Sequence, residues 1–163
     1  HGAVIAQPSD WPGFGPQKNR ALDMATGDWV LSLDADERLT PALRSEILTA
    51  THHSAHTDCF AIPRLSWYCG RFIRHSGWAP DYVDRLFRRG TARFSDDLVH
   101  ERLIPSGSVA RLENPMLHYS YPTPAHYWRK LQTYSDAWAA QKHAQGHRFC
   151  RRHGYQANAD IGT

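Results

Sequence analysis

The sequence predicts an α/β fold, because strand and helix patterns alternate along its first half and acidic residues follow a strand. Residues 29–33 form a short apolar run typical of a buried strand, and Asp34 and Asp36 come directly after it. Thr40-Pro41 then supplies the N-cap and first-turn residues that begin a helix. Ligands of open α/β sheets bind beyond the carboxyl ends of strands, so Asp34 and Asp36 are candidate site residues.

The composition is that of one globular domain with an anionic partner. The chain has 163 residues, 41% of them hydrophobic, and no apolar run approaches the roughly 20 residues that span a bilayer. Its 3 cysteines are too few and too irregularly spaced for a disulfide framework, which suits a reducing cytoplasm. The formal charge of +3, with 11 histidines, fits a nucleotide, a phosphorylated glycan or an acidic membrane face, although many soluble proteins are mildly basic.

Three helices and several further strands are expected. The first helix begins at Pro16 and stops at Gly27, and the third begins at Thr123-Pro124. The inward side of the second helix is predicted to be Leu43, Ile47 and Leu48. An apolar stripe on the third helix is interpreted as core packing and consists of Tyr127, Leu131, Tyr134 and Trp138. The predicted strands are residues 3–6, 59–68, 82–88, 99–104 and 116–121.

Asp34 and Asp36 predict a site for a hard divalent cation. Side chains two residues apart on an extended segment point the same way, so both carboxylates would face one ion. Mg²⁺ or Mn²⁺ held there would neutralise the diphosphate of a nucleotide leaving group. The alternative is a solvated strand end, because acids are common in turns.

Residues 13–19 predict an anion site at a helix start. The backbone amides of a helix N-terminus attract anions, and Lys18 and Asn19 add donors. The pattern lacks the Gly-Lys-Ser/Thr of a P-loop, and a glycine turn that feeds a capped helix is the alternative.

Glu101 and His118 are candidates for acid–base and metal chemistry. Glu101 follows a His and would accept a proton from an attacking hydroxyl, although a surface acid is the commoner case. His118 would bind metal or phosphate, and a half-buried structural histidine is its alternative. Arginines and aromatics alternate over residues 64–68, 77–81 and 85–89, which suits an anionic glycan or nucleic acid.

These motifs together resemble the bacterial family-2 glycosyltransferases, most closely the lipopolysaccharide core glucosyltransferases that transfer to heptose. The most specific segments are residues 11–19, Trp-Pro-Gly-Phe-Gly-Pro-Gln-Lys-Asn, and residues 27–37, Gly-Asp-Trp-Val-Leu-Ser-Leu-Asp-Ala-Asp-Glu. The likeness continues through residues 71–78, Arg-Leu-Phe-Arg-Arg at 85–89, Val-His-Glu at 99–101 and His-Tyr at 118–119. It covers most of the chain, from about residue 1 to about residue 146.

The resemblance implies a GT-A fold, which is a Rossmann-like mixed sheet flanked by helices. It also implies a nucleotide-sugar donor such as UDP-glucose, a divalent cation and inversion at the anomeric carbon. By motif position, Asp34 and Asp36 would hold the nucleotide and the metal, with Lys18 and Asn19 beside the nucleotide. Glu101 would be the catalytic base, and His118 a ligand to the metal or the diphosphate.

The resemblance also implies a glycan or lipid-linked acceptor, and it leaves nucleic acid as the weaker interpretation. Trp78, Asp81 and Arg85 are the expected acceptor-binding residues, with Asp84 another acid suited to that task. Asp97 is the reserve candidate for the base. Lipid-linked acceptors and cytosolic donors together imply a cytoplasmic protein, in peripheral contact with the anionic cytoplasmic face of the inner membrane.

The sequence departs from the family pattern at both ends. The usual first strand with Asn-Glu and the second strand with an acid are absent, so residues 1–146 are expected to be a partial glycosyltransferase domain, incomplete at its N-terminus. Residues 147–163 are expected to be an irregular tail. Two alternatives remain: a transferase of the same fold with another donor or acceptor, such as a heptose or a protein side chain, and a non-catalytic glycan- or nucleic-acid-binding module.

Overall fold

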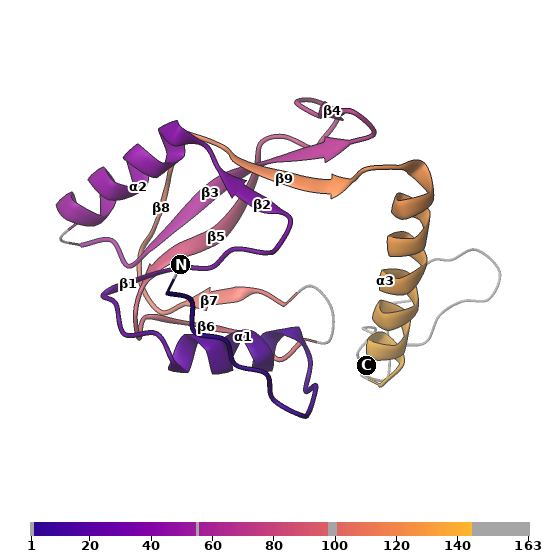
Figure 1. Cartoon of the computed structure of the whole chain (residues 1–163), viewed down its shortest axis with the longest axis horizontal. Coiled ribbons are helices and arrows are strands. Elements are labelled where there is room, and N and C mark those ends of the chain that lie inside the picture. The colour runs from indigo at the N-terminus through magenta and orange to yellow at the C-terminus, as the bar shows by residue number, and fades with distance from the viewer. Residues whose placement is uncertain (1, 55, 98–100, 145–163) are drawn as a thin grey trace, which may run out of the picture.

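The computed structural model describes residues 2–54, 56–97 and 101–144. In this part of the chain, a seven-stranded mixed sheet is accompanied by three helices (Figure 1). The main path of the sheet is β1 (Trp29–Leu31), β5 (Asp81–Arg88), β3 (Cys59–Tyr68), β9 (Met116–Tyr121) and β2 (Glu37–Leu39). Strands β4 (Arg71–Phe72) and β8 (Val109–Arg111) also pair with β3, and β6 (Ala92–Phe94) pairs with β7 (Leu103–Pro105) separately. The α/β expectation is confirmed.

Strand β3 is the centre of the sheet and makes it mixed. It runs antiparallel to β5 and parallel to β9, and β9 runs antiparallel to β2. Strands β1 and β2 are the two ends of the main path, although only residues 32–36 separate them in sequence. This short connection therefore joins the two opposite edges of the sheet, and it carries both candidate acids, Asp34 and Asp36.

The core has two parts, because neighbouring residues of a strand face opposite sides of the sheet. Cys59 and Phe87 belong to one cluster, and Phe60 and Leu86 belong to the other. The first cluster also contains Leu22, Ala92, Phe94 and Leu103, and the second contains Leu43, Ile62, Leu112 and Met116. Helix α1 (Phe14–Asp23) thus covers one face through Leu22, and α2 (Pro41–His53) covers the other through Leu43.

The first two helices follow the sequence pattern with corrections at their ends and sides. Helix α1 begins at Phe14, ahead of the expected Pro16, and ends at Asp23 before Gly27. Helix α2 begins as expected, with the Thr40 hydroxyl accepting from the backbone N–H of Leu43 at 3.1 Å. Leu48 is 53% exposed, so its inward placement was wrong. The packed side is Leu43, Ile47 and Ala50, at spacings of four and three residues, which leaves Leu48 beside it.

Helix α3 (Pro124–Ala144) begins where expected but is not a core helix. Tyr127 packs edge-on against Tyr121 with ring centroids 5.1 Å apart. Further along, the stripe is more exposed, with Leu131 at 41% and Trp138 at 38%. Figure 1 shows the reason, because α3 leads away from the end of β9 and its last turns lie beyond the sheet. The interpretation of the whole stripe as core packing was therefore wrong.

Three strand expectations need correction, and two predictions cannot be compared with the structure. Residues 3–6 form no strand, and β1 ends at Leu31, half-buried as an end strand rather than deeply buried. The strand expected over residues 99–104 is instead β7, which leaves Glu101 outside it. Residues 98–100 and the predicted irregular tail, 147–163, lie outside the described residues. None of the described helices has the length and apolar character that crossing a membrane requires.

Gly15 lets α1 approach the loop after β6. A Cβ atom at this position would lie 1.8 Å from the carbonyl oxygen of Ser95, which is backbone and cannot swing aside. The approach is also held by Asn19, whose side-chain amide exchanges two hydrogen bonds of 2.9 Å with the backbone of Phe94. This contact fixes α1 against β6, and it therefore fixes the position of Lys18, the residue before Asn19.

Gly15→Ala should therefore destabilise the fold by on the order of 1–3 kcal/mol, as overpacking does. The measurement is the free energy of unfolding in urea. Gly27→Ala is the matched control, since a Cβ there meets its nearest neighbour, the Trp29 carbonyl oxygen, at an ordinary 3.5 Å. Equal stability of the two variants would contradict the close approach.

Candidate active site

The segment from Asp34 to Glu37 is a turn closed by two reciprocal hydrogen bonds. The N–H of Glu37 donates to the carbonyl oxygen of Asp34 at 3.0 Å. The N–H of Asp34 in turn donates to Oε2 of Glu37 at 2.8 Å. The expectation of an extended segment with parallel carboxylates was wrong, because the Glu37 side chain folds back and tightens the connection between β1 and β2. Asp34 and Asp36 therefore face different partners.

Arg85 is the buried cation beneath this turn. Its Nη2 atom lies 2.5 Å from Oδ2 of Asp34 and 2.7 Å from Oε1 of Glu37. The side chain of Arg85 is 8% exposed and that of Glu37 is 0% exposed. Both charges have therefore left water, and each is tolerated because the other is present. The pair fixes the acidic turn to the middle of β5.

Lys18 connects Asp34 to Glu101. Its Nζ atom lies 3.0 Å from Oδ1 of Asp34 and 2.8 Å from Oε1 of Glu101. The three residues come from α1, from the turn after β1 and from the segment before β7, and they were predicted as site residues from three separate motifs. The structure thus brings together Lys18, a candidate for nucleotide binding, Asp34, a candidate for both metal and nucleotide binding, and Glu101, the candidate base.

The ionisation of Asp34 is set by its two cationic partners. Burial alone would raise the pKa of the Asp34 carboxyl, but the charges of Arg85 and Lys18 outweigh burial and hold this pKa below its ordinary value. Asp34 is therefore a carboxylate under all ordinary conditions. Asp84, on the same strand as Arg85, differs, because burial raises the pKa of its carboxyl.

A cavity of about 800 Å³ adjoins the cluster. Its lining includes Lys18, Asp34, Arg64, Asp84, Arg85 and Glu101. A volume of this size accommodates a sugar nucleotide or a saccharide rather than a single small ion. Nε of Arg85 is itself shielded from solvent and has no hydrogen-bond partner among the described residues.

Asp36 faces His118 of β9 and Lys130 of α3. Oδ2 of Asp36 lies 3.4 Å from Nε2 of His118 and 3.6 Å from Nζ of Lys130. The other ring nitrogen of His118, Nδ1, lies 3.2 Å from the hydroxyl of Ser66, which orients the ring. Burial lowers the pKa of His118, and the charge of Arg64 lowers it further against the opposing effect of Asp36. A neutral imidazole directed at a carboxylate is suited to metal binding.

These residues fit a cation that arrives with a phosphorylated substrate. No group of three or more His, Cys, Asp or Glu side chains within the described ranges could hold a metal ion alone. Asp36 and His118 would supply two ligands, and Mg²⁺ commonly completes its coordination with substrate phosphates and water. Asp34, the other candidate ligand, is committed to Lys18 and Arg85.

The remaining predicted residues have structural partners. Asn19 holds α1 to Phe94, as described above. Two donors of Arg64 contact Oδ2 of Asp81, at 2.9 and 2.7 Å. Trp78 packs edge-on against Tyr68 and Tyr121. Arg85 lies under the acidic turn.

Asp97, the reserve base, is engaged by two neighbours. Its Oδ2 accepts from the hydroxyl of Ser95 at 2.8 Å, and its Oδ1 accepts from the amide of Gln141 at 3.1 Å. These bonds join the loop after β6 to α3, so Asp97 has a clear structural function. Of the two candidate bases, Glu101 is the one that contacts Lys18.

Sequence reasoning missed two residues of the site. Glu37 was not among the predicted site residues, yet it is the buried partner of Arg85. An acid that closes a turn three residues after another acid was the available signal. Lys130 was not singled out at all, because a lysine on a long helix has no distinctive local pattern. Only the position of α3 brings it to Asp36.

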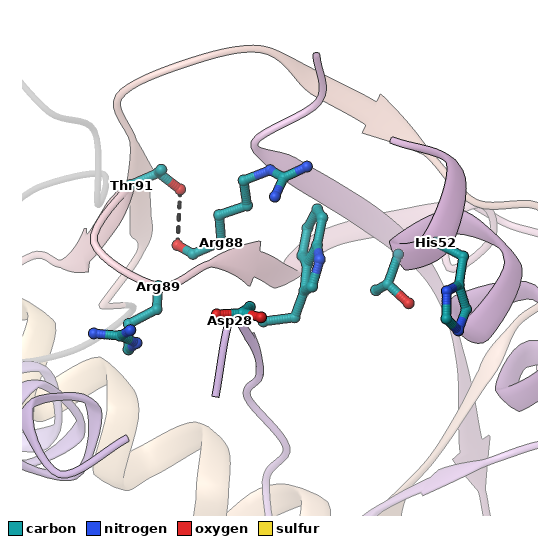
Figure 2. Close-up of a pocket in the computed structure, with 7 residues that line it drawn as sticks. Asp28, His52, Arg88, Arg89 and Thr91 are labelled. Atoms are coloured by element: carbon teal, nitrogen blue, oxygen red, sulfur yellow. Dashed lines mark hydrogen bonds between the residues drawn. The ribbon is translucent and has the colours of Figure 1, made fainter. Parts of the chain in front are cut away.

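A second cavity, of about 540 Å³, lies at the other end of β1 (Figure 2). It contains two arginines, which point in different directions in Figure 2. Arg88 stacks over the ring of Trp29 at 4.6 Å and donates to the carbonyl oxygens of Ser54 and Thr57. Arg89 donates to the carbonyl oxygen of Gly27 at 2.9 Å. Both guanidinium groups in this cavity therefore donate to backbone carbonyl oxygens of the protein itself.

Replacing Arg85 by Met should destabilise the protein by about 3–5 kcal/mol, because a buried carboxylate on Glu37 would lose its cation. The measurement is the free energy of unfolding in urea at neutral pH. Arg93→Met is the matched control, since Arg93 pairs with Asp23 on the surface and such pairs contribute little. A similar, small effect of both variants would contradict the buried pair.

The same comparison has a predicted pH dependence. The folded pKa of Asp34 is depressed, so the stability that this group contributes is present above its ordinary value of 3.8 and is lost as pH falls through the folded value. The difference between the parent protein and Arg85→Met should therefore shrink below about pH 4. A difference that stays constant in acid would show that Arg85 acts through packing alone.

Comparison with known proteins agrees with this architecture. Residues 1–113 match the family described as Glycosyl transferase family 2. Over 119 residues, the chain is 33% identical to a lipopolysaccharide core biosynthesis glycosyltransferase, LpsC, of Rhizobium meliloti. This alignment covers 67% of this chain and 41% of that protein. The chain is 29% identical over 158 residues to an uncharacterized glycosyltransferase of Rickettsia typhi, covering 90% and 53%.

A similar protein of Rickettsia prowazekii is 28% identical over 155 residues, covering 88% of this chain and 52% of that protein. The chain thus spans about half the length of the relatives it matches. The family match includes α1, the acidic turn, Arg85 and Glu101, and it ends before β9 and α3. With its mixed sheet and flanking helices of GT-A type, this chain belongs to glycosyl transferase family 2.

Proposed function

We propose that this chain contributes the reaction centre of an inverting glycosyltransferase, which moves a sugar from a nucleotide diphosphate to a hydroxyl of a saccharide acceptor. The observation that carries the proposal is the contact of Lys18 with both Asp34 and Glu101, in the lining of one large cavity. The family membership supports the reaction class. The lipopolysaccharide core name of the Rhizobium relative supports a core saccharide as acceptor. The proposed donor, a nucleotide-activated hexose such as UDP-glucose, rests on the resemblance of the sequence motifs alone.

Glu101 is the proposed general base. In the transfer, the acceptor oxygen forms a bond to the anomeric carbon while the bond from that carbon to the diphosphate oxygen breaks. The electron pair of the breaking bond leaves with the nucleoside diphosphate, and the acceptor proton passes to a carboxylate oxygen of Glu101. Oε1 of Glu101 is held at 2.8 Å by Lys18, which positions the carboxylate. Its side chain is 16% exposed, so competing water has limited access.

Asp36 and His118 are the proposed ligands of a divalent cation, Mg²⁺ or Mn²⁺. When bound, the cation would neutralise charge on the departing diphosphate. The two side chains approach from β9 and from the turn after β1, and Ser66 keeps the His118 ring in orientation. Asp34 and Lys18 are proposed to bind the nucleotide, and Asn19 fixes the helix that carries Lys18.

The acceptor is proposed to bind in the same cavity, against lining residues other than Lys18, Asp34 and Glu101. Arg85 lines the cavity, and its guanidinium is a donor group that suits a saccharide oxygen. Asp84 and Arg64 line the same cavity, and Arg64 in turn orients Asp81. Trp78 would contribute through the aromatic cluster that it forms with Tyr68 and Tyr121. Such an acceptor and a cytosolic donor suit the cytoplasmic face of an anionic membrane.

Glu101→Gln should lower turnover by roughly 10²–10⁴-fold and change donor affinity little, because Gln keeps the size of the side chain but accepts no proton. Steady-state kinetics of the active enzyme and donor binding by calorimetry are the two measurements. Glu113→Gln is the control, since Glu113 is an exposed acid. Normal turnover of the Glu101 variant, or loss of donor binding instead, would remove Glu101 from this role. Absence of both transfer and donor hydrolysis in the parent would favour a glycan-binding module.

Asp36→Asn should weaken donor binding at least about tenfold when Mn²⁺ is present, since even residues outside a coordination sphere typically have effects of that size. With a chelator present, the parent and the variant should bind the donor alike. Asp136→Asn, an exposed acid on α3, is the control. Equal loss with and without Mn²⁺ would show that Asp36 does not act through a cation.

A further inference from the structure

One face of α3 carries basic and hydroxyl side chains next to the site. His126, Arg129, Lys130 and Thr133 follow one another at spacings that place them on one side of a helix. They line a cavity of about 360 Å³ together with Tyr134. No Asp or Glu of the described residues takes part in this lining. The cavity is therefore surrounded by donors.

Lys130 joins this face to the reaction centre. Its Nζ atom lies 3.6 Å from Oδ2 of Asp36 and 5.4 Å from the ring centroid of Tyr121. A separation of 3.6 Å exceeds hydrogen-bond length, so Asp36 attracts the ammonium without using a donor in a tight bond. The side chain is 29% exposed, and its three N–H groups remain available to an incoming acceptor atom.

The surroundings of Lys130 favour an anion with more than one charge. Lys130 shares its cavity with two further nitrogen-bearing side chains, those of Arg129 and His126. Arg129 adds a guanidinium, whose planar fork of donors matches the geometry of a phosphate. Of these side chains, Lys130 faces a carboxylate, that of Asp36, on the side of the reaction centre. A phosphate group in this cavity would therefore meet positive charge from both Lys130 and Arg129.

We propose that the face of α3 formed by His126, Arg129, Lys130 and Thr133 is a phosphate-binding subsite beside Asp36. This inference rests on the proposed function, in which the sugar donor is a nucleotide diphosphate. It adds the residues that bind the phosphate. The family match ends at residue 113, so it assigns nothing to α3. The shared chemistry is a phosphate ester, which comes either from the diphosphate of the donor or from a phosphorylated saccharide acceptor. Lys130 is the central contact because it alone of the four reaches Asp36.

The test is calorimetric binding of inorganic pyrophosphate to the 163-residue chain, in chelator, so that neither turnover nor a cation is needed. Lys130→Gln should weaken binding about 10–100-fold, as loss of a charge-assisted hydrogen bond does. Lys130→Arg should keep most of the affinity. Lys142→Gln is the matched control, with the same change of charge on α3 about three turns, roughly 18 Å, away. Arg129→Gln should give a smaller loss than Lys130→Gln.

Two further titrations identify the source of the phosphate. Loss of affinity for uridine diphosphate in Lys130→Gln, with glucose 6-phosphate unaffected, would assign the subsite to the donor, and the reverse would assign it to the acceptor. Failure of the parent to bind any of the three anions, or equal binding by parent and Lys130→Gln, would overturn the proposal. Unchanged thermal unfolding by circular dichroism confirms that the variant is folded. Pyrophosphate binding that depends on Lys130 in a protein with no transfer activity would defeat the proposed function alone.

Discussion

Burial of Arg85 between Glu37 and Asp34 is the interaction on which the site depends. A guanidinium on the middle of β5, 8% exposed, requires carboxylates close by, and the chain supplies them from the turn that joins the two end strands of the sheet. The turn is then held at both ends, by Arg85 and by its own reciprocal hydrogen bonds. Because Asp34 is anchored in this way, Lys18 has a fixed partner and can in turn hold Glu101.

The two acids of the motif perform different tasks for the same reason. Asp34 is turned towards β5 and α1, where two cations engage it, and Asp36 is turned towards β9 and α3. The neutral His118 and the cationic Lys130 then give Asp36 an environment suited to a metal and to phosphate. In this arrangement the nucleotide-binding and metal-binding duties proposed for the motif fall on separate side chains, whose carboxylates face opposite parts of the fold.

Much of the fold was predictable because its signals are local. Strands β3 and β9 were predicted with the bounds that the structure has, since each is a segment rich in apolar and aromatic residues that Gly or Pro turns delimit. The starts of α2 and α3 follow from Thr-Pro pairs. Failures occurred where distant contacts decide the outcome. Leu48 is apolar but lies beside the packed face of α2, and the stripe of α3 leaves the sheet after Tyr127.

The sequence by itself determined the family, the order of most elements and the candidate residues Lys18, Asp34, Asp36, Glu101 and His118, because motifs and periodicity are properties of short segments. Only the tertiary structure decided which of them meet. Contacts between α1, the acidic turn and the segment before β7 join residues far apart in the chain, and no local pattern encodes such a distance. Likewise, only the folded chain shows that the buried Glu37 pairs with Arg85 and that Asn19 bonds α1 to Phe94. The partner of a polar side chain is known only once the chain has folded around it.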